Sequence, residues 1–278
     1  MTEKENIKNL ASKEACETCP AFNAANLKKL GLNIDEFDHV IALAGNPNVG
    51  KSTVFNALTG LRQHTGNWPG KTVTRAEGAY EYSDKRYKIV DLPGTYSLLA
   101  TSLDEEVARN FILFGQPDVT IVVVDASRLE RNLNLVIQVL EITDKVVVCL
   151  NLMDEAERRG LKIDERMLSK DLGVPVVPTS ARYGVGIPEL LAAVHEVATN
   201  QVKTNPYRIK NEPPELKNAI KQIVSKLKKV YPELPNPRWV ALRLLDGDEE
   251  IAEAIENGEI GSIVQVGVDD NRLLEVPA

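Results

Sequence analysis

The sequence is poor in cysteine, with only three cysteines in 278 residues. Three cysteines cannot form the disulfide framework of a small secreted domain, which excludes that class. Cys149 lies in an apolar run and is expected in the core, whereas Cys16 and Cys19 form a single CxxC pair. One such pair supplies only half of the ligands of a usual zinc site, so two reduced thiols in a leader segment are the simpler interpretation.

Long hydrophobic runs are also missing. The longest apolar runs, Val119–Val124 and Val146–Leu150, are far shorter than the roughly 18 residues of a membrane-spanning helix, and they predict buried strands. The first residues, Met1–Leu10, are polar and lack the apolar stretch of a signal peptide. We therefore expect a soluble, cytosolic chain.

Basic residues are scarce near the C-terminus. The whole chain has a net charge of −7, and Val240–Ala278 contains ten acidic and only two basic residues, a formal charge of −8. A surface of this sign repels the phosphates of nucleic acids. Direct nucleic-acid binding is therefore not expected there.

From His39 onward the sequence alternates short apolar runs with longer amphipathic stretches. The predicted strands are His39–Gly45, Tyr87–Asp91, Val119–Ala126, Lys145–Asn151 and Pro175–Thr179. The predicted helices are Ser52–Thr59, Asp104–Phe114, Leu133–Thr143, Glu165–Leu172 and Pro188–Thr199. Continuous apolar strands separated by helices indicate an α/β fold, with a mostly parallel sheet covered by helices on both faces. Val73–Tyr82 alternates in polarity, which suits an edge strand.

Three regions follow from this pattern. Residues 1–38 form a polar leader with a helical stretch at Phe22–Leu30, and residues 39–203 form the α/β domain. A proline-containing linker, Gln201–Pro214, leads into a mainly helical domain at residues 204–278, which ends in the acidic segment. Apolar residues between Leu216 and Tyr231 recur at helical spacing and must be buried, within their own bundle or against the α/β domain. Shorter helices are predicted at Arg238–Leu245 and Glu249–Asn257.

A phosphate-binding loop follows the first predicted strand. The segment Gly45, Asn46, Pro47, Asn48, Val49, Gly50, Lys51 and Ser52 fits the pattern GxxxxGK[ST], and Thr53 continues into the predicted helix. The glycines allow backbone N–H groups to surround phosphates, and the start of the helix favours negative charge. Lys51 is expected to reach the β- and γ-phosphates, and the hydroxyl of Ser52 to bind Mg²⁺. This predicts a P-loop nucleotide-binding fold.

A second motif, DLPG at Asp91–Gly94, ends another predicted strand. The carboxylate of Asp91 can hold Mg²⁺, and the N–H of Gly94 can sense the γ-phosphate. Between the two motifs, Leu61–Gly78 has few apolar residues and is expected to be a loop that orders around γ-phosphate and Mg²⁺. Its hydroxyl candidates for the metal are Thr65, Thr72 and Thr74, and its Trp68 is either a core anchor or a partner contact.

A site for the nucleotide base is predicted after the last strands. Asn151 and Asp154 form an NxxD motif in which Leu152 replaces the usual lysine. A carboxylate at Asp154 can accept from N1–H and the 2-amino group of guanine, whereas adenine offers neither donor at those positions. Ser180 and Ala181 follow the final strand and match the loop that offers backbone N–H to guanine O6. The order and spacing of these motifs predict binding of GTP and GDP.

With these motifs in place, the chain resembles the cytosolic part of the ferrous iron transport protein B (FeoB) family. The resemblance runs from about Val40 to Glu250 and rests on the following segments: Gly45–Thr53, Gly66–Gly70 with Thr72, Asp91–Glu105, Pro117–Glu141, Asn151–Gly160 and Arg238–Glu250. It implies that Thr72 is the switch threonine that meets Mg²⁺ and γ-phosphate. It also implies that residues from about Thr204 onward couple the GTPase to a membrane part and influence GDP binding. The chain departs from the family pattern in the 38 residues before the first strand, in Thr74 and in Ile260–Ala278.

Catalysis must proceed here without the glutamine that many GTPases place after the DxxG glycine, because that position is Thr95. Arg62 and Arg75 lie near the loop that is expected to order around γ-phosphate and Mg²⁺, but no motif marks either as an arginine finger. Asn48 matches the asparagine with which related GTPases hold K⁺ beside the phosphates, and the alternative is that it braces the loop through a side-chain-to-backbone bond. The expected catalytic residues are therefore Asn48, Lys51, Thr72 and Gly94, in a slow GTPase stimulated by K⁺.

The leading hypothesis is a GTP-hydrolysing regulatory module at the cytoplasmic face of a ferrous iron transporter. Its expected cofactors are Mg²⁺ and K⁺, and its expected partner is the membrane permease portion of the transporter; an oligomer is possible. The alternative is a soluble Era- or TrmE-like GTPase that acts on RNA or ribosomes, which would call for a basic extension. A third alternative is a nucleotide-binding module without useful catalysis.

Overall fold

The computed structural model describes Leu27, Leu32 and residues 36–60, 63–68, 71–99, 102–208, 212–232 and 234–257. The predicted leader helix, the Cys16/Cys19 pair and the segment Ile260–Ala278 lie outside the described residues, apart from Leu27, which is helical and buried. Among the described residues, no helix has the length and apolar character needed to cross a membrane.

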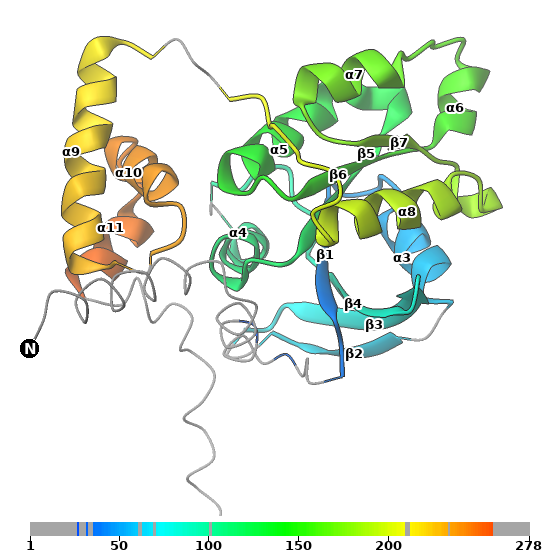
Figure 1. Cartoon of the computed structure of the whole chain (residues 1–278), viewed down its shortest axis with the longest axis horizontal. Helices are drawn as coiled ribbons and strands as arrows, with labels where there is room; N and C mark the ends of the chain where they lie inside the picture. Colours follow the sequence, from blue (N-terminus) through cyan, green and yellow to red (C-terminus); the bar gives the residue numbers. More distant parts are fainter. Residues whose placement is uncertain are drawn as a thin grey trace, which may run out of the picture.

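A seven-stranded sheet forms the centre of the molecule (Figure 1). Its strands are β1 (His39–Gly45), β2 (Gln63–Asn67), β3 (Thr74–Tyr82), β4 (Lys85–Asp91), β5 (Val119–Asp125), β6 (Val146–Asn151) and β7 (Val176–Pro178), in the order β2-β3-β4-β1-β5-β6-β7. The five neighbouring strands β4, β1, β5, β6 and β7 run parallel to one another. Strand β3 pairs antiparallel with both β4 and β2. The predicted α/β fold is confirmed.

Helices cover both faces of the sheet. They are α3 (Lys51–Thr59), α4 (Leu103–Gly115), α5 (Leu129–Ile142), α6 (Met153–Arg158), α7 (Glu165–Leu172) and α8 (Ile187–Ala198), with short 3₁₀ turns η1 (Ala126–Arg128) and η2 (Ala181–Tyr183). Along β1, Ala42 packs with α4 and α5, whereas Ile41 packs with α3 and α8, because successive side chains point to opposite faces. This explains why the parallel strands are apolar throughout. Cys149 on β6 is fully buried, as predicted, and burial raises the pKa of its thiol to about 12.

The structure corrects the prediction for the segment between the first helix and β4. Val73–Tyr82 was expected to be the edge strand, but β3 lies between β4 and β2, and β2 is the outer strand. Most of the expected loop Leu61–Gly78 is thus part of a hairpin. The sequence of β2, QHTGN, has no apolar alternation, because its backbone pairing with β3 requires no buried face.

The C-terminal helices form a group beside α4 (Figure 1). They are α9 (Pro214–Val230), α10 (Pro237–Leu245) and α11 (Glu249–Glu256), close to the predicted ranges. Helix α9 packs against α10, so its apolar stripe is buried within its own bundle. The buried side chains of this bundle are nevertheless continuous with the core around α4 and α5. The apolar stripe of α9 is therefore buried within its own bundle, and that bundle shares one core with the α/β domain.

Hydrogen bonds attach the linker before α9 to the α/β domain. The backbone N–H of Asn205 donates to Gly173 O (2.9 Å), and the N–H of Tyr207 donates to Leu172 O (2.9 Å). Farther along, Asn236 at the start of α10 donates from Nδ2 to the carbonyl oxygens of Glu141 (2.8 Å) and Ile142 (2.9 Å) at the end of α5. These contacts fix the helical bundle relative to the sheet.

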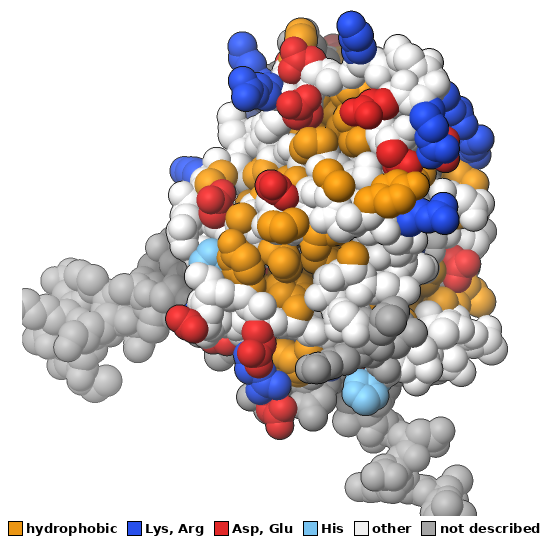
Figure 2. Space-filling view, turned by 90° about the vertical axis from the view of Figure 1, so that its right-hand side faces the viewer, with side chains coloured by type: hydrophobic (Ala, Val, Ile, Leu, Met, Phe, Trp, Pro, Cys, Tyr) orange, Lys and Arg blue, Asp and Glu red, His pale blue; other side chains and the backbone are white. Residues whose placement is uncertain are grey.

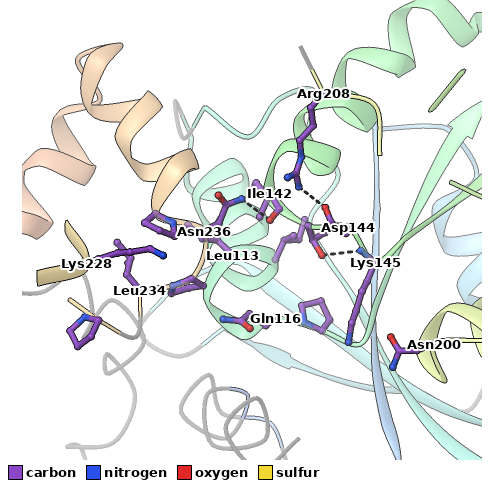
Figure 3. Close-up of a pocket in the computed structure, with 16 residues that line it drawn as sticks. Leu113, Gln116, Ile142, Asp144, Lys145, Asn200, Arg208, Lys228, Leu234 and Asn236 are labelled. Carbon is purple, nitrogen blue, oxygen red and sulfur yellow. Dashed lines mark hydrogen bonds and ion pairs between the residues drawn. The ribbon is translucent and has the colours of Figure 1, made fainter. Parts of the chain in front are cut away.

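A cavity of about 610 Å³ lies where the bundle meets the sheet (Figure 3). Leu113 and Gln116 at the end of α4 line one side, and Lys228 and Leu234 of the bundle line the other. Asp144 and Lys145, just before β6, also line it. The cavity is therefore at the amino ends of the parallel strands, whereas the predicted nucleotide motifs follow their carboxyl ends.

Candidate nucleotide site

The phosphate-binding loop connects β1 to α3 and is closely packed at both glycines. A Cβ on Gly45 would lie 2.7 Å from Val123 O on the neighbouring β5. Gly50 has φ +82°, in the left-handed region, and a Cβ there would lie 2.5 Å from Asn151 Nδ2. Only glycine fits such positions, since a side chain would collide with fixed neighbours. The sequence predicted a loop whose glycines let backbone N–H groups surround phosphates, and the structure adds the close approach of β5 and Asn151.

Lys51 and Asp91 meet beside this loop. Strands β1 and β4 are parallel neighbours, with Leu43 paired to Asp91, so their carboxyl ends adjoin. The Lys51 ammonium forms an ion pair with Asp91 Oδ1. Burial raises the pKa of the Asp91 carboxyl above its ordinary value, and the charge of Lys51 opposes that rise. Ser52 follows Lys51 in the chain and is exposed, as is Thr53. A serine hydroxyl and the Asp91 carboxylate are hard oxygen donors of the kind that Mg²⁺ binds.

The DLPG motif lies directly against the phosphate-binding loop. A Cβ on Gly94 would lie 3.5 Å from Pro47, and the N–H of Thr95 donates to Gly45 O (3.2 Å). Thr95 is only 4% exposed. The residue in the place of the usual glutamine is thus buried and bonded to the loop, which leaves it poorly placed to orient a water.

Thr72 is not joined to the other site residues. It is exposed, and in the described part of the chain no hydrogen bond or ion pair links it to Lys51, Ser52 or Asp91. The segment before it is anchored, because Trp68 is 4% exposed and packs edge-on against Phe111 of α4, with ring centroids 5.4 Å apart. This settles Trp68 as a core anchor.

Asn151 links the loops of the site. Its side chain is buried, with Nδ2 donating to Val49 O (3.0 Å) and Oδ1 accepting from Ala181 N–H (3.1 Å) and Thr179 Oγ1 (3.2 Å). The amide therefore holds the phosphate loop, the end of β6 and the loop after β7 together. The sequence indicated the position of Asn151, but only the structure shows that its side chain braces loops.

Asp154 and Ser180 lie close together in the structure. The backbone N–H of Asp154 donates to Ser180 Oγ (3.2 Å). The Asp154 carboxylate also pairs with Arg158 (2.8 Å), a residue one helical turn later that the sequence analysis did not single out. Its i, i+4 spacing on α6 was the available signal. The same arginine contacts Glu155 (3.0 Å).

Asn48 is exposed and has φ +65°. Asparagine is one of the few residues other than glycine that adopt this left-handed conformation readily. Within the described residues no hydrogen bond reaches its side chain, so the proposed bracing bond is not seen there. Its neighbour Asn46 is buried, and its Oδ1 has no donor among the described residues.

The face that carries α3, α6 and the start of α8 presents a patch of apolar side chains (Figure 2). Acidic side chains lie within and around the patch, and basic ones lie mainly at its margin. Tyr183 and Val185, next to the base-site loop, are more than 60% exposed. Apolar surface of this kind suits the flat face of a nucleotide base.

Comparison with known proteins gives the family. The model of ferrous iron transport protein B matches residues 39–194, which is more than half of the chain, and the model of the FeoB cytosolic helical domain matches residues 213–269. The chain belongs to the FeoB family. The Fe(2+) transporter FeoB of Escherichia coli K12 is 44% identical over 215 residues, covering 75% of this chain and 27% of that protein. The chain thus spans about a quarter of the length of the FeoB relatives it matches.

Solved FeoB cytosolic domains share the fold over about four fifths of this chain. The cytosolic domain of Legionella pneumophila FeoB is 36% identical with a TM-score of 0.71, and covers 81% of this chain and 87% of that one. The cytosolic domain of Thermotoga maritima FeoB in GDP form I is 39% identical with a TM-score of 0.71, covering 82% and 90%. The match includes the FeoB G domain, so the α/β domain is a GTPase domain. FeoB membership also decides against the Era- or TrmE-like alternative.

Proposed function

We propose that this chain is the potassium-stimulated regulatory GTPase module of a ferrous iron transporter, at the cytoplasmic face of the membrane. The observation that carries the proposal is the meeting of Lys51 and Asp91 beside a glycine-constrained loop, in a chain that matches both FeoB cytosolic domains. The iron-transport role rests on the relatives, which are named Fe(2+) transporters.

The site residues take the following roles in this proposal. Backbone N–H groups of Gly45–Thr53 surround the phosphates of GTP, and Lys51 leaves Asp91 to contact the β- and γ-phosphates. Ser52, Thr72 and Asp91 hold Mg²⁺, which neutralises charge that develops on the phosphates. Gly94 N–H contacts the γ-phosphate. Asp154, Ser180 and Ala181 read guanine, while Asn151 holds their loops in place.

Hydrolysis is slow because Thr95 is buried and no glutamine orients the attacking water. Asn48 binds K⁺ through its side-chain oxygen, and the cation supplies positive charge near the bond between the β- and γ-phosphates. The exposed Asn48 side chain and its position in the loop favour this role over bracing.

The chain divides functionally into a leader (1–38), a GTPase domain (39–203) and a helical regulatory domain (204–278). Its partner is the membrane permease portion of a FeoB transporter, and self-association is compatible with this arrangement. The acidic charge of the helical region disfavours nucleic acid as a partner.

A chimera tests the proposal. Residues 39–257 would replace the matching segment of Escherichia coli FeoB in cells that lack their own FeoB, and uptake of radioactive Fe²⁺ would be measured. We expect uptake to be restored by the chimera and lost with Lys51→Ala, a change that removes the phosphate contact. Equal uptake with and without Lys51, at equal protein level, would contradict a GTPase-dependent role in iron transport.

The helical domain is expected to slow nucleotide release. Removing residues 204–278 should speed GDP release several-fold, because the bundle shares a core with α4, the next helix along the chain after the DLPG motif. Release of a fluorescent GDP analogue from the full and shortened chains, followed by stopped-flow, measures the effect. Identical rates in two folded proteins would contradict coupling between the domains.

A further inference from the structure

Two charged residues of helix α4 form ion pairs with different parts of the chain. In residues 71–73, which lead into β3 and are here called the switch segment, Lys71 Nζ donates to both carboxylate oxygens of Glu106, each at 2.9 Å. On the side of the helical domain, Arg109 forms ion pairs with Glu250 (2.8 Å) and Asp248 (3.5 Å). Glu106 and Arg109 are three residues apart, so they are neighbours on one face of the helix.

Arg109 is unusual because its side chain is 0% exposed. Its Nε donates to Asn110 Oδ1 (3.1 Å), which fixes the guanidinium. Its outer nitrogens lie 2.8 Å from the carboxylate of Glu250 and 3.5 Å from that of Asp248. A buried charge held mainly by electrostatic attraction is sensitive to any further charge nearby.

Glu106 is such a charge. Burial raises the pKa of Glu250, the charge of Arg109 opposes the rise, and the negative charge of Glu106 adds to it. The geometry agrees, because Glu106 is one helical turn from Arg109, whose guanidinium lies 2.8 Å from Glu250. While Lys71 neutralises Glu106, this repulsion is reduced, and Arg109 remains available to the helical domain.

Lys71 precedes Thr72, the residue assigned to Mg²⁺ and γ-phosphate in the proposed function, on which this inference rests. We propose that Lys71, Glu106, Arg109 and Glu250 form a charge relay that reports the nucleotide state of the switch segment to the helical domain. When Thr72 moves to the phosphates, Lys71 is drawn from Glu106. Glu106 then repels Glu250 and competes for Arg109, which loosens α11 from α4.

In this relay Arg109 is a positioning residue, since it touches no nucleotide. The docked bundle goes with the GDP form, and by reciprocity of coupling an undocked bundle weakens GDP binding. Damage at either end of the relay therefore has the same effect on GDP release. In the relay Lys71 acts through Glu106 on the charge of Glu250, so once that charge is removed the loss of Lys71 has little left to act on and the two effects do not multiply.

The experiment is a double-mutant cycle on the full chain, with release of a fluorescent GDP analogue as the readout. Lys71→Met removes the charge at the switch end, and Glu250→Gln removes it at the other. Each is expected to speed GDP release about fivefold or more, and the double variant no more than the faster single variant. Asp246→Asn is the matched control, because Asp246 pairs with Arg243 of its own bundle, and it should leave the rate unchanged.

Thermal unfolding shows that each variant is folded. Should Glu250→Gln not fold, Asp248→Asn takes its place, since asparagine preserves the helix cap that Asp248 provides to Ile251 N–H. Effects that multiply in the double variant, or a faster rate in Asp246→Asn, would overturn the relay. If the unsubstituted chain bound no guanine nucleotide, the proposed function itself would be wrong, which is a distinct result.

Discussion

Changing Asp154 to asparagine is expected to weaken GTP binding at least tenfold and to improve the relative binding of xanthosine triphosphate. The Asp154 carboxylate would accept two hydrogen bonds from guanine, each contributing about 1.5–3 kcal/mol. An asparagine offers an amide N–H₂ to one of those donors, whereas the extra oxygen of xanthine can accept from it. Competition of GTP and xanthosine triphosphate against a fluorescent GDP analogue measures both effects.

Glu155→Gln is the matched control for this change. Glu155 contacts the same arginine as Asp154, with Arg158 Nη2 at 3.0 Å and 2.8 Å respectively, so both variants disturb the Arg158 pairing. Only Asp154 follows the NxxD pattern, so the control should keep its GTP affinity. A normal GTP affinity in Asp154→Asn would remove Asp154 from the base site, and an equal loss in both variants would assign the effect to Arg158.

The second large effect concerns potassium. GTP hydrolysis by the unsubstituted chain should be on the order of tenfold or more faster in K⁺ than in Na⁺, because a cation near the phosphates stabilises the developing charge. Removing the Asn48 side chain should lower the K⁺ rate to the Na⁺ rate while nucleotide still binds. Phosphate release in matched chloride salts measures the rates.

Two replacements distinguish the effect of the Asn48 side chain from the effect of its backbone conformation. Asn48→Ala removes the oxygen but places alanine at φ +65°, which costs about 1–2 kcal/mol, whereas glycine adopts this conformation freely. Both variants should lose the response to K⁺. If Asn48→Gly kept the full response and only Asn48→Ala lost it, the loop conformation would be the cause. Equal rates of the unsubstituted chain in K⁺ and Na⁺ would show that the charge comes from elsewhere.

The sequence alone determined the local parts of this protein. The run from Gly45 to Ser52 is contiguous, so its loop chemistry can be read without knowing the fold, and the apolar runs of β1, β5 and β6 predict a sheet buried on both faces. Chain order then placed the motifs, because the carboxyl ends of parallel strands meet at one edge of the sheet. The helices of the C-terminal bundle followed from apolar periodicity and turn residues.

Tertiary structure alone decided how distant residues meet. Asn151 reaches Val49 across 102 positions of the chain, and Trp68 became a core anchor only because Phe111 lies opposite it. The strand β2 was missed, since pairing with β3 rather than an apolar face defines it. Likewise, nothing in the local sequence of Arg109 shows that its buried charge meets Asp248 and Glu250, some 140 residues later. Such contacts depend on how the layers of the fold pack together, and a short stretch of sequence does not determine that packing.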